Sequence, residues 1–139
     1  MKDDTRLWMK YAEENVKSAK VLKDNNLFNP CLQNIQQAVE KFLKAVIIEY
    51  GFEFRKTHSI NELKDTIASH GITVDITKEE CHFLDSVYLP SKYPISSALP
   101  DFEPDVKICD EYLTATDRIK ASVKEILTKS CCGPNRKKI

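Results

Sequence analysis

Apolar residues recur three and four positions apart along most of the chain, the spacing that places them on one face of an α-helix. The first such segment begins near Asp3 or Asp4, either of which is expected to cap it, and fades at 24–26. Its predicted apolar stripe consists of Trp8, Tyr11, Ala12, Ala19 and Leu22. Asn15 falls on the same stripe and is expected to bond to a neighbouring helix, because buried amides need hydrogen-bond partners.

A second predicted helix begins at Asn29-Pro30, with the asparagine as its cap, and ends at Tyr50-Gly51. Its polar residues fall within one arc of about 140° when successive residues are placed about 100° apart. They are Gln33, Gln36, Gln37, Glu40, Lys41 and Lys44, here called the polar stripe. The remaining surface is apolar, so this helix is expected to contact several neighbours or a second subunit, with the polar stripe open to a ligand.

Two capping boxes predict the starts of two shorter helices, because a serine or threonine three residues before a glutamate satisfies free N–H groups of the first turn. The boxes are Ser59 with Glu62 and Thr77 with Glu80. The first of these helices is predicted to end at 70–71 and the second at Pro90. Residues 72–76 alternate as a strand does, but no partner strand is evident, so they are interpreted as cover for one end of the bundle.

A last helix is predicted from Glu103-Pro104 to Thr128. Together the segments predict an all-α fold, an up-and-down bundle of four to five helices. One domain is expected over residues 1–128, followed by a flexible basic tail at 129–139. Residues 89–103 contain three prolines and no regular period. Such long loops often bind ligands, although a rigid wrap over the core explains the same residues.

Composition narrows the possible partners without selecting one. Lys plus Arg and Asp plus Glu number 21 each, so net charge provides no general attraction to nucleic acid or membrane. The charged N-terminus lacks a secretory signal and no run is long enough to span a bilayer, so a cytoplasmic protein is expected. Cys31, Cys81 and Cys109 fall inside predicted helices, which favours reduced thiols. No zinc-ligand spacing is present, so neither a metal nor a cofactor is expected.

Three separated segments together resemble the HEPN domain family of small all-α domains. They are Trp8 with Tyr11-Ala12 and Ala19, residues 36–45 (QQAVEKFLKA) followed by 55–63 (RKTHSINEL), and residues 88–94 (YLPSKYP). The resemblance implies a helical bundle, commonly a homodimer, often encoded beside a minimal nucleotidyltransferase in toxin–antitoxin systems. Some members of that family are metal-independent ribonucleases, and others are thought to bind nucleotides.

The ribonuclease branch of that family carries an arginine and a histidine separated by four to six residues, and this chain departs from the pattern. Arg55 precedes His58 with only two residues between them, and Arg6 and Arg118 have no histidine at the required distance. Metal-free RNA cleavage needs a base for the 2′-hydroxyl proton and a cation for the developing charge. A ribonuclease that uses Arg55 and His58 is therefore the disfavoured alternative.

The leading hypothesis is a dimeric binding module that recognises a nucleotide, a nucleic-acid phosphate or a nucleotidyltransferase partner. Cations would contact phosphate and an aromatic ring would stack on a base. The candidate binding residues are Gln37, Lys41, Lys44, Arg55, His58, Lys92 and Tyr93. Arg55 and His58 precede a predicted helix N-terminus, which attracts anions, although a capping or packing role also explains His58. A bundle whose only chemistry is dimerisation is the third hypothesis.

Overall fold

Five helices form the described part of the chain in the computed structural model, which describes residues 1–53, 56–92 and 103–132, without the side chains of 89–92 and 131–132. The helices are α1 (Asp3–Asp24), α2 (Phe28–Tyr50), α3 (Ile60–Ala68), α4 (Lys78–Lys92) and α5 (Val106–Cys132). No strand occurs within the described residues, so the predicted all-α bundle is confirmed. None of these helices is both long enough and apolar enough to cross a membrane.

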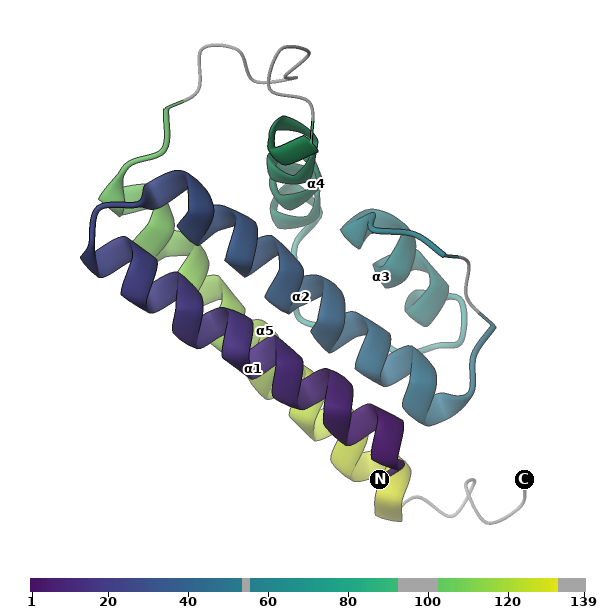
Figure 1. Ribbon diagram of the computed structural model, residues 1–139. Coiled ribbons are helices and arrows are strands. Elements are labelled where there is room, and N and C mark those ends of the chain that lie inside the picture. Colours follow the sequence, from purple (N-terminus) through teal and green to yellow (C-terminus); the bar gives the residue numbers. More distant parts are fainter. Residues whose placement is uncertain (54–55, 93–102, 133–139) are drawn as a thin grey trace.

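α2 is the central helix of the bundle, because it contacts each of the other four. α1 lies antiparallel to α2 along its length, and α5 runs beside both, whereas α3 and α4 lie on the other side of α2 (Figure 1). Phe42, Leu43 and Ile47 of α2 are completely buried. The prediction that α2 needs several neighbours is therefore confirmed within one chain.

α1 packs on α2 through small side chains. Ala12 and Ala19 are completely buried, and Met9 and Val16 continue the same buried stripe. Small residues at these positions let the two helix backbones approach closely. Tyr11, predicted to belong to the apolar stripe, is instead 43% exposed, because α1 turns its alanine face toward α2.

A buried carboxylate from α2 joins the ends of three helices. Glu49 is 1% exposed and accepts hydrogen bonds from the Lys2 backbone N–H and the Thr5 hydroxyl, each at 2.9 Å. Its second oxygen accepts from the Ser130 hydroxyl at 2.8 Å. Glu49 thereby ties the first turn of α1 and the last turn of α5 to the last turn of α2.

The starts of three helices differ from the prediction. Asp3 and Asp4 lie inside the first turn of α1, and no side chain caps that helix. Asn29 likewise lies inside the first turn of α2 rather than before it. α5 begins two residues later than predicted, with the Asp105 carboxylate accepting from the Ile108 N–H at 2.9 Å. The capping box before α4 is confirmed, because Thr77 and Glu80 each accept the other's N–H.

The predicted end of α2 is confirmed, whereas α3 ends at Ala68 and not at the predicted 70–71, because residues 69–71 form a turn that follows the helix. Gly51 has a left-handed backbone with φ of 69°, as the predicted end of α2 requires. α4 runs two residues past Pro90, since a proline in the last turn removes only one backbone donor. α5 runs past Thr128 to Cys132, because buried Ser130 holds its last turn against α2.

The segment between α3 and α4 covers the core without forming a strand. Val74 and Ile76 are 2% and 4% exposed, and the intervening residues make no ladder. The alternation of residues 72–76 therefore reflects a loop that turns two side chains inward, as the sequence interpretation held.

Three cysteines lie inside the core with free thiols. Burial raises the pKa of Cys31 to about 12 and that of Cys81 to about 11. Burial also raises the pKa of Cys109. These thiols therefore stay protonated at neutral pH, which makes them poor nucleophiles.

Candidate functional site

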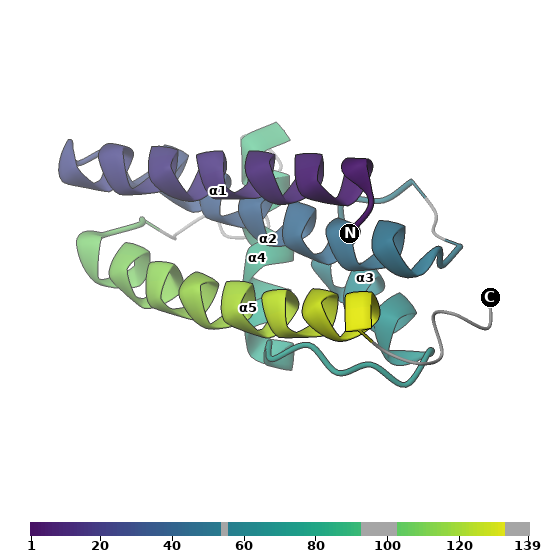
Figure 2. The same ribbon diagram turned by 90° about the horizontal axis from the view of Figure 1, so that it is seen from below.

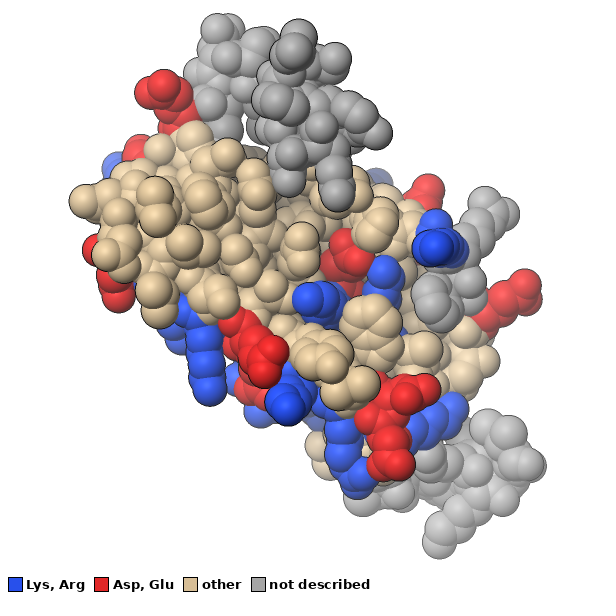
Figure 3. Space-filling model, in the orientation of Figure 1, with Lys and Arg blue, Asp and Glu red and all other residues tan. Residues whose placement is uncertain are grey.

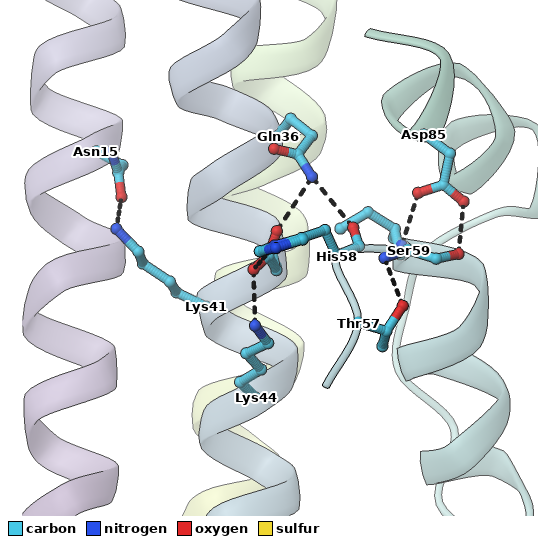
Figure 4. A network of polar contacts seen from close by, with 10 residues as sticks. Asn15, Gln36, Lys41, Lys44, Thr57, His58, Ser59 and Asp85 are labelled. Atoms are coloured by element: carbon cyan, nitrogen blue, oxygen red, sulfur yellow. Dashed lines mark hydrogen bonds and ion pairs between the residues drawn. The ribbon is translucent and has the colours of Figure 1, made fainter. Parts of the chain in front are cut away.

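Four polar residues of α2 and of the segment before α3 form one connected group (Figure 4). This group, here called the Glu40 network, consists of Gln36, Glu40, Lys44 and His58. One oxygen of Glu40, Oε2, accepts from Lys44 Nζ at 2.8 Å and lies 3.1 Å from His58 Nδ1. The other, Oε1, accepts from Gln36 Nε2 at 3.3 Å. A single carboxylate thus binds an ammonium, an imidazole and an amide.

The helical spacing of α2 builds this network. Gln36, Glu40 and Lys44 follow one another at intervals of four, so their side chains stack along one face of the helix. The three residues are 1%, 7% and 8% exposed, in that order, and the segment before α3 lies against Gln36 and Glu40. Gln36 holds that segment by donating to the His58 carbonyl at 3.3 Å. These three residues of the polar stripe are therefore buried and bonded to other residues of the same chain. The expectation that the polar stripe is open to a ligand is wrong for them.

Aromatic rings border the Glu40 network on two sides. The Nζ of Lys44 lies 5.5 Å from the centre of the Trp8 ring, which α1 contributes. The His58 ring stacks on Tyr88 of α4, with ring centroids 5.1 Å apart. The side chain of Lys44 is only 10% exposed, whereas that of His58 is 54% exposed. His58 is therefore the member of the network that a ligand reaches first.

Lys41 points away from the Glu40 network, toward α1 (Figure 4). Its Nζ donates to Asn15 Oδ1 at 2.6 Å, and Asn15 donates in turn to Asn34 Oδ1 at 3.0 Å. The prediction that Asn15 bonds to a neighbouring helix is confirmed. Lys41 is half-buried and Gln37 is exposed, so both border the surface beside the network.

The N-terminus of α3 already holds a carboxylate. Asp85 of α4 accepts from the Ser59 hydroxyl at 3.0 Å and from the N–H groups of Ile60 and Asn61 at 2.6 and 3.3 Å. These are the groups that would bind a phosphate at a helix N-terminus. Ser59 rather than His58 caps α3, since its hydroxyl accepts from the Glu62 N–H. A phosphate site at this helix end, suggested for Arg55 and His58, is therefore taken by the chain itself.

The predicted binding residues divide into three groups. Lys44 and His58 meet at Glu40, whereas Lys41 and Gln37 lie on the same helix outside the network. Arg55, Tyr93 and the side chain of Lys92 lie outside the described residues.

Sequence reasoning missed the residues that organise the site. Gln36 and Glu40 were recognised as polar members of α2, but not as the partners that fix His58. The spacing of four between Gln36, Glu40 and Lys44 was the available signal. Nothing in the sequence indicates that Tyr88 stacks on His58, because the two residues come from different elements and meet only in the folded chain.

Positive and negative charges are mixed on the face of the molecule that Figure 3 shows. Positive and negative side chains lie next to each other near its centre, and a broad uncharged area covers the end where α1 leads into α2 (Figure 3). A ligand would therefore be selected by local geometry and not by a strong field of one sign. Among the described residues, no three His, Cys, Asp or Glu side chains are grouped as ligands of a metal ion.

Known proteins share this sequence pattern and fold. A family model for the HEPN domain matches residues 5–126. The crystal structure of an archaeal HEPN homologue is similar, with 27% identity, a TM-score of 0.67, and 91% of this chain and 99% of that chain covered. A crystal structure of a Thermus thermophilus protein has 25% identity and a TM-score of 0.71, covering 90% of this chain and 99% of that one. No curated protein matches the chain.

Proposed function

Because the chain belongs to the HEPN domain family, we propose that it is a binding module that recognises a nucleotide or nucleic-acid phosphate beside the Glu40 network. The main support is the position of His58. Its Nδ1 is held by buried Glu40, its ring stacks on Tyr88, and its side chain is 54% exposed. This arrangement fixes the ring and leaves Nε2 to donate to a phosphate oxygen when the imidazole is protonated.

The electrostatics of the network favour an anion at this position. The charge of Glu40 is matched by Lys44, so a proton on His58 leaves one net positive charge at the surface. Trp8 and Tyr88 lie nearby, and because Lys44 lies over one ring and His58 stacks on the other, a base would stack on a ring face that these two residues leave open. Cation and ring together are the combination that nucleotide recognition requires.

Thermal denaturation with ATP, GTP, CTP and UTP, each added separately, tests this proposal. A ligand of the native state raises the melting temperature, and at about 100 times Kd it stabilises by about 2.7 kcal/mol. We expect His58→Ala to abolish the shift. His82→Ala, which removes an exposed histidine from α4, should retain it. No shift with any of the four nucleotides, or an equal shift in both variants, would overturn the proposal.

We also propose that the chain forms a homodimer and binds a minimal nucleotidyltransferase in a toxin–antitoxin-like system, as the family resemblance implies. Leu7 and Tyr11 lie one turn apart on α1 and are 44% and 43% exposed. Exposed apolar side chains at these positions support a contact of α1 with a second copy of the chain. Light scattering after size exclusion should give twice the 16.0 kDa mass of one chain. If the neighbouring gene encodes a minimal nucleotidyltransferase, that protein should co-elute with the chain. A mass of one chain excludes the dimer, and separate elution excludes the partner.

A ribonuclease is the second candidate, and one observation favours it. A histidine whose Nδ1 is held by a buried carboxylate has the orientation of a general base, as Glu40 and His58 show. The arginine and histidine spacing of the nuclease branch is nevertheless missing, which ranks this candidate lower. Cleavage of RNA in the presence of a metal chelator, lost in His58→Ala, would place it first.

A further inference from the structure

α1 and α5 lie on the face that Figure 2 turns toward the viewer. Residues of both helices line a groove between them. Both helices pack mainly on α2 and contact each other little, so a space of about 550 Å³ opens between them. The lining residues are Met1, Arg6, Met9, Lys10, Glu13, Glu14, Lys17, Lys124, Leu127 and Thr128. None of them belongs to the Glu40 network, so the groove is a separate surface.

The floor of the groove is apolar and its rim is mainly cationic. Met9 and Leu127 are 7% and 0% exposed and form part of the core beneath it. Four cationic side chains, from Arg6, Lys10, Lys17 and Lys124, line the groove together with two carboxylates. Apolar surface exposed in such a groove is hydrated unfavourably, and the charges beside it are mostly of one sign. Both features are typical of a surface that binds another molecule.

Lysines outnumber the carboxylates that neutralise them on this rim. Lys120 donates to the Glu13 carboxylate, and Lys124 approaches the same carboxylate at 3.9 Å. The hydrogen bond from Lys120, with the charges of Lys124 and Lys17, holds the pKa of Glu13 below its ordinary value. With Glu14 and the Asp3 carboxylate that binds Arg6 included, three carboxylates face five cationic side chains, so the rim keeps excess positive charge for an anionic partner. The five are Arg6, Lys10, Lys17, Lys120 and Lys124.

We propose that this groove binds an amphipathic helix of a protein partner, one with an apolar stripe flanked by acidic residues. A third helix lying between two neighbouring helices covers the mainly apolar lining of the groove with its apolar stripe and brings its carboxylates to the lysines of the rim. A single-stranded nucleic acid fits less well, because none of the described residues that line the groove is aromatic. The proposal is independent of the nucleotide proposal, since the two surfaces share no residue.

The chain provides its own reporters for this groove. It has only two methionines, Met1 and Met9, and both line the groove. In protein labelled with ¹³C at the methionine methyl groups, the two methyl signals therefore report on this surface directly. The probe is a synthetic helical peptide of about 18 residues, with leucine at i, i+3, i+4 and i+7 and glutamate on both flanks. A second peptide carries lysine in place of each glutamate, and oligouridine serves as the nucleic-acid probe.

We expect the glutamate peptide to shift both methionine methyl signals and the lysine peptide to leave them in place. Lys10→Glu combined with Lys124→Glu should weaken binding of the glutamate peptide about tenfold or more. Lys78→Glu combined with Lys107→Glu changes the net charge equally at exposed positions outside the groove and should leave the affinity unchanged. Lys10→Gln with Lys124→Gln, which removes the charges without reversing them, should weaken binding several-fold if the reversed variant folds poorly.

Three results would overturn the proposal. The methyl signals could remain unchanged at saturating glutamate peptide, which would exclude binding in the groove. Oligouridine or the lysine peptide could bind as tightly as the glutamate peptide, which would assign the surface to another class of ligand. The two double glutamate variants could lose equal affinity, which would reduce the effect to net charge.

Discussion

Glu40→Ala is expected to lower the free energy of unfolding by about 3 kcal/mol, because it leaves a buried ammonium without its partner. The side chain of Lys44 is only 10% exposed, and its Nζ lies 2.8 Å from the Glu40 carboxylate. The same substitution removes the acceptor of Gln36 and the carboxylate that holds His58. Urea denaturation of the two proteins measures the difference.

A double variant separates the ion pair from the rest of the network. Glu40→Leu with Lys44→Met removes both charges and keeps apolar volume, so its stability should return to within about 1 kcal/mol of the original. Nucleotide binding should still be lost, since His58 no longer has its carboxylate. If the double variant is as unstable as Glu40→Ala, the loss does not come from the unpaired lysine.

Glu49→Ala is expected to cost about 3 kcal/mol, because three donors lose one buried acceptor group. The Lys2 N–H and the Thr5 and Ser130 hydroxyls all bind this carboxylate, so the change loosens the ends of α1, α2 and α5 together. Chemical denaturation again measures the effect.

Two variants serve as comparisons for Glu49→Ala. Ser130→Ala removes one of the donors and should cost only about 1 kcal/mol. Glu53→Ala removes an exposed glutamate close by in sequence and should change stability by less than about 0.5 kcal/mol. If Glu49→Ala is no worse than Glu53→Ala, the buried carboxylate does not join the three helices.

Local patterns in the sequence predicted the helices well, because helix formation depends on neighbours three and four residues away. The apolar face of α2 and the box at Thr77 and Glu80 follow from such spacing, and the end of α2 follows from the left-handed backbone that Gly51 adopts. The cap of α1 was mispredicted because a distant residue takes part in the start of this helix. The N–H of Lys2, for example, finds its acceptor in Glu49, 47 residues away.

The candidate site was predictable only in part. The polar stripe contained Glu40 and Lys44, and their favourable spacing was visible in the sequence. The sequence did not show that other residues cover this stripe. The cover depends on the segment at His58, which folds back over α2, and on Tyr88 of α4, which stacks on His58. A helical pattern identifies which residues share a face, but it does not show which other segment will lie on that face.

The central claim is that His58, fixed by Glu40, contacts a nucleotide, and ring signals of the three histidines test it most directly. Spectra that correlate ring protons with ¹³C are recorded as ATP, or whichever nucleotide gives the largest thermal shift, is added. We predict that the His58 signals move progressively to saturation, whereas those of His82 on the exposed surface of α4 stay in place. His58 signals that do not move at saturating nucleotide, or movement at His70 or His82 instead, would contradict the claim.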